Sequence, residues 1–207
     1  MGRRRRRMAG VVIGAMFFAC LMSGTASADH QTKNGGVHWG RYRWAGAVQS
    51  TERIFWLFDR TGNPMMHQAL QQWVQSWNGQ RNLNVKSAPL VAYYQDDRYV
   101  GQCGNYNYPG HSFMTFCAGD PGTTGIASLQ WVGAHVSSAY VLIRPTGLNY
   151  GQMFTAITHE MGHVMGLSHR PEAGATMHAN GNFDGQIHWY DQHDLDALTA
   201  LYGSHPD

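Results

Sequence analysis

Three histidines and a glutamate form the pattern H-E-x-x-H-x-x-G-x-x-H between His159 and His169. Successive helical residues turn by about 100°, so the side chains of His159 and His163 lie about 40° apart and can reach one point beside the helix. Zinc accepts histidine nitrogens, and a catalytic zinc site uses three protein ligands and keeps one position open. The spacing therefore predicts a metal centre that begins with these two imidazoles.

The third histidine needs a break in the helix. On a continuous helix, His169 would point about 120° away from the first pair and could not reach the same ion. Gly166 can take a left-handed conformation, which ends the helix and turns the chain back. We expect His169 to approach from the far side and to complete the binding of one Zn²⁺ ion.

Glu160 directly follows the first histidine and is expected at the rim of the histidine face. Zinc lowers the pKa of its bound water to about 7, and a nearby carboxylate can take the proton as that water attacks a carbonyl. We therefore expect Glu160 to act as the general base of a hydrolysis without a covalent intermediate. The alternative is a helix whose histidines are merely exposed or hydrogen-bonded, but the five residues would meet by chance in roughly one such chain in ten thousand.

Capping residues predict three helices. Pro64 is suited to the first helical position, and Gln152 can complete a capping box. The helices are predicted over Asn63 to Gly79, Asn149 to about Leu167, and Asp191 to Gly203. The second of them carries the histidine pattern.

Short apolar runs between Gly-, Asn- and Pro-rich turns predict the strands. They cover Ile54–Phe58, Leu90–Tyr94, Phe113–Cys117, Ile126–Val132 and Tyr140–Ile143.

The beginning of the chain has the features of a signal peptide over residues 1–28. A basic run, Arg3–Arg7, precedes the apolar stretch Met8–Met22, and Ala26-Ser27-Ala28 supplies a cleavage pattern. A membrane anchor is the alternative, but the apolar stretch is shorter than the roughly 20 residues that a spanning helix needs. We expect cleavage after Ala28, secretion, and no stable membrane insertion. The remainder divides into an N-terminal arm, residues 29–50, and a catalytic domain, residues 51–207.

Loss of this leader changes the charge of the protein. All 13 acidic residues remain, but five of the 15 Lys and Arg residues leave, so the formal net charge falls from +2 to about −3. The basic surplus that nucleic-acid binding requires is then gone. We expect no nucleic-acid partner.

Three cysteines are present, and Cys20 leaves with the leader unless it is a lipidation site. In an exported protein, the remaining Cys103 and Cys117 are expected to form a disulfide. A loop of this length would stabilise the fold by about 3 kcal/mol in the chain-entropy description. The alternative is a free Cys103 thiol that acts as an inhibitory zinc ligand.

The motif and the residues after it resemble the metzincin clan of zinc proteases, and within it the matrixins and related small secreted bacterial proteases. Metzincins carry a methionine in a turn beneath the metal, and Met177 stands at that place. The segment Asp191 to Gly203 resembles the last helix of matrixins. The chain departs from the matrixin pattern at Arg170, where Ser or Thr is usual, and at Met177-His178-Ala179, where Met-Tyr-Pro is usual.

This resemblance implies one α+β metzincin-like domain with a twisted mixed sheet, two long helices, a C-terminal helix and a cleft at the zinc. It also implies that the strand Ile126–Val132 pairs with an extended protein or peptide substrate. His178 and His188 could line that cleft, although scattered histidines are more often surface residues. A calcium ion is possible, but no acidic cluster has the pattern of a calcium loop.

The expected protein is a monomeric, secreted zinc endopeptidase. Two alternatives remain open. The first is an exported binding or toxin-like protein that uses the same domain with little turnover, although such a protein would be free to lose Glu160. The second is a zinc hydrolase of a non-peptide amide.

Overall fold

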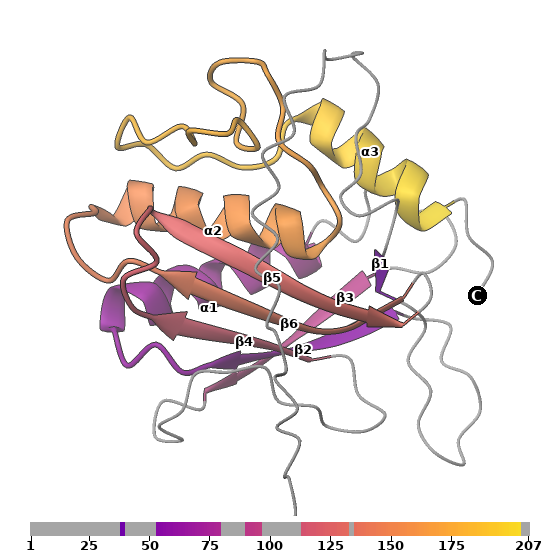
Figure 1. The fold of residues 1–207 in the computed structure, drawn as a ribbon, viewed down its shortest axis with the longest axis horizontal. Coiled ribbons are helices and arrows are strands. Elements are labelled where there is room, and N and C mark those ends of the chain that lie inside the picture. The colour runs from indigo at the N-terminus through magenta and orange to yellow at the C-terminus, as the bar shows by residue number, and fades with distance from the viewer. Residues whose placement is uncertain (1–37, 40–52, 80–89, 97–112, 133–134, 204–207) are drawn as a thin grey trace, which may run out of the picture.

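The computed structural model describes residues 38–39, 53–79, 90–96, 113–132 and 135–203. These residues form six strands and three helices in an α+β arrangement (Figure 1). The strands are β1 (His38–Trp39), β2 (Arg53–Asp59), β3 (Leu90–Asp96), β4 (Phe113–Ala118), β5 (Gly125–Val132) and β6 (His135–Ile143). The helices are α1 (Pro64–Gly79), α2 (Tyr150–Val164) and α3 (Gln192–Gly203).

The sheet is mixed, as predicted. Its strand order is β1-β6-β4-β2-β3, and all of these neighbours are parallel. β5 pairs with β6 in the antiparallel direction, with Gly125 opposite Ile143. Among the described residues β5 pairs with no other strand, so it forms one edge of the sheet.

The core fills the space between the helices and one face of this sheet. α1 and α2 pack against each other, and their apolar side chains are buried with those of β2, β4 and β6. Trp73 of α1, Phe154 of α2 and Phe116 of β4 are among the largest fully buried side chains. This packing fixes α2 along its length, so the functional part of the helix rests on a rigid base.

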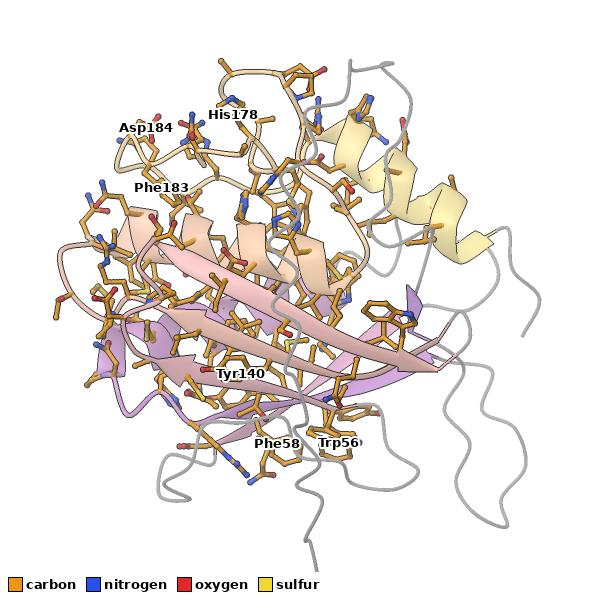
Figure 2. The ribbon with its side chains drawn as sticks, in the orientation of Figure 1. Trp56, Phe58, Tyr140, His178, Phe183 and Asp184 are labelled. Carbon is orange, nitrogen blue, oxygen red and sulfur yellow. The ribbon has the colours of Figure 1, made fainter. Side chains whose placement is uncertain are left out.

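The opposite face of the sheet carries aromatic side chains. Trp56, Phe58 and Tyr140 lie there, away from the helices (Figure 2). Trp56 stacks on Tyr93 of the neighbouring strand, with ring centroids 5.1 Å apart. The side chains of β2 thus alternate between the core and the outer face, as a strand requires.

The helices begin where their capping residues predict. The side-chain oxygen of Asn63 accepts hydrogen bonds from the backbone of Met65 and Met66 at the start of α1. The capping box of α2 is complete, because Asn149 and Gln152 each accept a bond from the other's backbone nitrogen at 2.9 Å. The helix ends at Val164, three residues earlier than predicted, because the turn at Gly166 closes it sooner.

Strand boundaries were predicted less well, since β6 begins at His135 and not at Tyr140. Cys117 is disulfide-bonded. Its predicted partner Cys103 lies outside the described residues, as does the predicted leader, residues 1–28. Within the predicted arm, residues 29–50, the structure describes β1 alone. No helix in the described part of the chain is long and apolar enough to span a membrane.

Candidate metal centre

α2 presents His159 and His163 on one side, one helical turn apart. Both residues are buried, and their Nε2 atoms lie 3.1 Å from each other. Histidine is costly to bury without partners, so the packing must supply them. The helix therefore forms the fixed half of a nitrogen-rich site.

The turn after α2 brings the third histidine to the same point. Gly166 has a φ of 105°, a backbone conformation that residues with a Cβ rarely adopt. Its N–H donates to the carbonyl of His163 at 3.1 Å, and the N–H of Leu167 donates to the carbonyl of Gly162 at 2.8 Å. These two bonds form a Schellman motif, which ends the helix and reverses the chain. The predicted role of Gly166 thus agrees with the structure.

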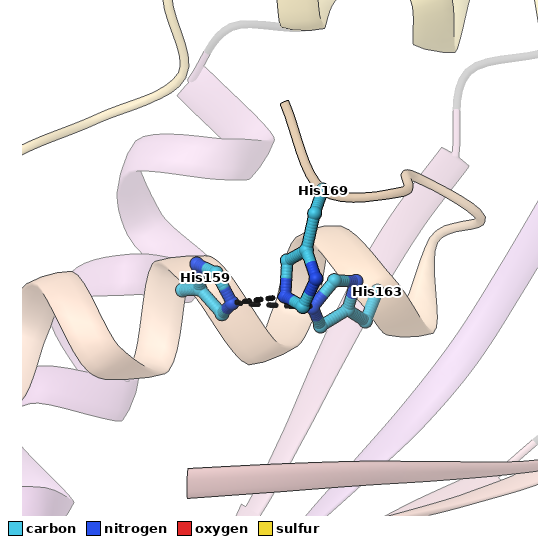
Figure 3. Close-up of side chains that lie close together, drawn as sticks. All are labelled: His159, His163 and His169. Carbon is cyan, nitrogen blue, oxygen red and sulfur yellow. Dashed lines mark hydrogen bonds between the residues drawn. The ribbon is translucent and has the colours of Figure 1, made fainter. Parts of the chain in front are cut away.

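His169 returns to the helix from this turn (Figure 3). Its Nε2 lies 3.0 Å from the Nε2 of His163 and 3.3 Å from that of His159. Unlike the other two residues, His169 is exposed. The three imidazoles expected to converge do so.

The other nitrogen of each buried imidazole is tied to the backbone. The Nδ1 of His159 lies 2.7 Å from the carbonyl oxygen of Thr176, and the Nδ1 of His163 lies 2.9 Å from that of Leu167. A carbonyl oxygen only accepts hydrogen bonds, so each Nδ1 carries a proton, and in the neutral imidazole the Nε2 then presents a lone pair. Lone pairs so close repel one another unless a cation or a proton lies between them. The arrangement fits a zinc ion, whose histidine ligands commonly donate their second N–H to a carbonyl or a carboxylate.

The methionine turn packs beneath the helix. Met177 is fully buried, and a Cβ added to Gly162 would lie 2.3 Å from its sulfur. The carbonyl of Met177 accepts a hydrogen bond from the N–H of Arg170 at 2.8 Å. Because the preceding residue, Thr176, holds His159, this turn supports the metal centre from below. The sequence singled out Met177, whereas the need for glycine at position 162 was missed.

Glu160 lies in the same cleft as the histidines. The cleft has a volume of about 420 Å³ and runs between the beginning of β5 and the loop after the methionine turn. Its remaining lining residues are small or uncharged: Thr123, Thr124, Gly125, Ile126, Ala127, Ala179, Asn180, Gly181 and Phe183. Glu160 is buried, which places a carboxyl group inside a confined site. This combination can support acid–base chemistry next to a metal.

His178 and His188, which sequence reasoning considered for the cleft, are not among its lining residues. His188 instead lies 2.8 Å from the carboxylate of Asp184 and bonds to the side chain of Asn182. Figure 2 shows His178, Phe183 and Asp184 in the loop that passes over α2. Phe183 is the residue of this group that lines the cleft. The spacing of these residues in the sequence did not single out Phe183 as a cleft residue.

A cluster of ion pairs beside the third histidine was not predicted from the sequence either. The guanidinium of Arg170 donates two bonds of 2.7 Å to Asp191 and one of 3.0 Å to Asp194. Burial alone would lower the pKa of Arg170, but its hydrogen bonds to these two carboxylates outweigh burial and raise the pKa. Burial raises the pKa of Asp194, which is almost fully enclosed. Arg170 therefore joins the loop of His169 to the beginning of α3.

Comparison with known proteins finds similar sequences for this part of the chain. Residues 145–203 match the sequence model of the matrixin family. The interstitial collagenase of Oryctolagus cuniculus is 40% identical over 55 residues, which are 27% of this chain and 11% of the collagenase. That of Sus scrofa is 37% identical over 51 residues, or 25% of this chain and 11% of the collagenase. The matches thus span about a tenth of these relatives.

Two solved structures are similar at low sequence identity. Archaemetzincin from Methanopyrus kandleri has a TM-score of 0.45 and 13% identity, with coverage of 75% of this chain and 98% of that one. Metalloproteinase-II from Bacteroides fragilis has a TM-score of 0.44 and 13% identity, with coverage of 72% and 52%. The match to the matrixin family confirms the resemblance predicted from the histidine pattern: residues 145–203, which include all three histidines, are matrixin-like.

Proposed function

We propose that this metzincin-like zinc metalloprotease is a secreted endopeptidase in which His159, His163 and His169 hold the zinc and Glu160 is the general base. One observation carries the proposal. Three imidazole Nε2 atoms from one short segment lie within 3.3 Å of one another, in the cleft that also contains Glu160. Three neutral nitrogen donors are the ligand set of a catalytic zinc site.

When bound, zinc supplies Lewis-acid chemistry by lowering the pKa of water and polarising a carbonyl. The protein supplies the rest. The carbonyls of Thr176 and Leu167 fix the tautomers and ring orientations of His159 and His163. The Glu160 carboxylate takes a proton from the attacking water and delivers it to the leaving amine. No side chain forms a covalent bond with the substrate in this scheme.

The cleft is suited to an extended peptide. β5 forms one of its walls and has a free edge in the described part of the sheet. An extended substrate can pair its backbone with such an edge, so that the scissile bond is presented to the histidines and Glu160. The chain matches only a tenth of its collagenase relatives, and we assign it no substrate of theirs. Export of the protein follows from the leader predicted in residues 1–28.

Replacement of Glu160 tests this function. Glu160→Ala should keep one zinc per chain, because the carboxylate is not a ligand, but should lower kcat for casein cleavage by about 10²–10⁴-fold. Zinc content by atomic absorption and peptide release by mass spectrometry measure the two effects. Undiminished turnover would refute the role of Glu160.

The alternatives give different results in the same assay. A parent protein that binds peptides without cleaving them would support a binding protein, and hydrolysis of non-peptide amides alone would support the other hydrolase. Export is tested by the N-terminal sequence of protein recovered from the culture medium, which should begin at Asp29.

A further inference from the structure

Gly125, the first residue of β5, lies against the side chain of Glu160. A Cβ added to Gly125 would lie 2.8 Å from Glu160 Oε1, 2.9 Å from its Cγ and 3.1 Å from its Cδ. Non-bonded carbon atoms normally stay about 3.5–4.0 Å apart. The space that any other residue's Cβ would need is thus taken by the carboxyl group of Glu160.

The backbone on either side of this contact is held in place. Gly125 pairs with Ile143 of β6, and the N–H of Arg144 donates to the carbonyl of Thr124 at 3.0 Å. On the other side, α2 is buried along its length. Since neither backbone can move away cheaply, an added Cβ would turn the Glu160 side chain.

The backbone conformation at position 125 does not require glycine. Its φ is not among the positive values found at other glycines of the chain, and a glycine inside a strand weakens the strand. A close approach by another group is one of the reasons for a glycine in a strand. Here that group is Glu160.

We propose that Gly125 is a positioning residue for the general base. Its missing side chain lets the Glu160 carboxyl lie against the edge strand, where a paired substrate would pass. The strand that would hold the substrate therefore also sets the place of the carboxylate. This inference rests on the proposed function for its effect on catalysis, whereas the contact itself can be tested without any activity.

The first test is Gly125→Ala. We expect kcat to fall by about 100-fold, as a displacement of roughly 1 Å can cause, with KM changed by less than about threefold. Zinc affinity, measured by competition with a chromophoric chelator, should stay within about twofold because the three histidines are untouched. A crystal structure of the variant should show the Glu160 carboxyl displaced.

Gly119→Ala is the matched control. A Cβ at Gly119 would lie 2.7 Å from Leu142 Cδ1, so it too crowds the end of a flexible side chain, but Gly119 does not line the cleft. We expect parental kcat and KM for this variant. Parental kcat in Gly125→Ala, or loss of zinc together with activity, would overturn the positioning role.

A double-mutant cycle, measured as melting temperatures, tests the contact independently of catalysis. With Glu160→Ala as background, Gly125→Ala no longer meets the carboxyl, so the change in melting temperature that it causes should be about 2–4 °C more favourable than in the parent. Equal changes in both backgrounds would overturn the proposal. A parent without peptidase activity would instead refute the proposed function, and this cycle would still decide whether the contact exists.

Discussion

The three histidines differ in how the fold holds them. His159 and His163 belong to a buried helix, and each has its Nδ1 tied to a carbonyl. His169 is exposed and depends on the turn at Gly166 for its position. The first two are therefore preorganised by the core, whereas the third is brought in by local backbone geometry.

Removal of the third imidazole should weaken metal binding without unfolding the protein. We expect His169→Ala to raise the Kd for zinc by more than about 100-fold, which exceeds the 10–100-fold effect of losing a partner outside the ligand set. Chelator competition measures the Kd, and circular dichroism checks the fold. His178→Ala is the control, because His178 lies in the neighbouring loop and does not line the cleft. Unchanged affinity in His169→Ala would show that the third ligand is assigned wrongly.

At the scale of elements, Arg170 joins α3 to the loop that carries His169. Its guanidinium bonds to Asp191, which caps α3, and to Asp194 in the first turn of that helix. The backbone of Arg170 also bonds to Met177. One residue therefore links the third histidine, the methionine turn and the last helix.

Arg170→Gln should destabilise this link. Asp194 would remain buried without its cationic partner, and we expect a loss of about 2 kcal/mol, below the 3–5 kcal/mol of a fully buried pair because Arg170 and Asp191 are partly exposed. Urea unfolding measures the difference. Glu172→Gln is the control, since Glu172 bonds to the same guanidinium from an exposed position and should change stability very little. Equal losses in both variants would argue against the role of Asp194.

Local signals predicted the helices and the convergence of the three histidines, whereas contacts between distant residues were not predictable. The capping box of α2 and the turn at Gly166 each involve residues within a few positions, so they could be read from spacing. The contact of Gly162 with Met177 and that of Gly125 with Glu160 join residues that only the fold brings together. The α+β class and the mixed sheet were predicted through the resemblance, because strand order cannot be read from short apolar runs.

For the whole molecule, the candidate metal centre lies between two parts of the fold. On one side are α2 and the beginning of β5, and on the other is the loop that leads to α3. Zinc bound only by the native state should stabilise the fold by about 4 kcal/mol when the free ion is at 1,000 times its Kd. We expect chelation to lower the melting temperature by several degrees in calorimetry. His159→Ala should melt at the same temperature with and without chelator. A parent protein whose melting temperature does not change with chelator would indicate that no metal is bound.

All three proposed ligands lie between His159 and His169, whereas one wall of the cleft is the later loop that includes Gly181 and Phe183. A single cut in that loop would leave every ligand on the same fragment. A nicked preparation could thus contain its full complement of zinc and still have lost the surface that receives substrate. The zinc content would then overestimate the fraction of active protein in a sample. Titration with a tight-binding inhibitor would measure that fraction more directly.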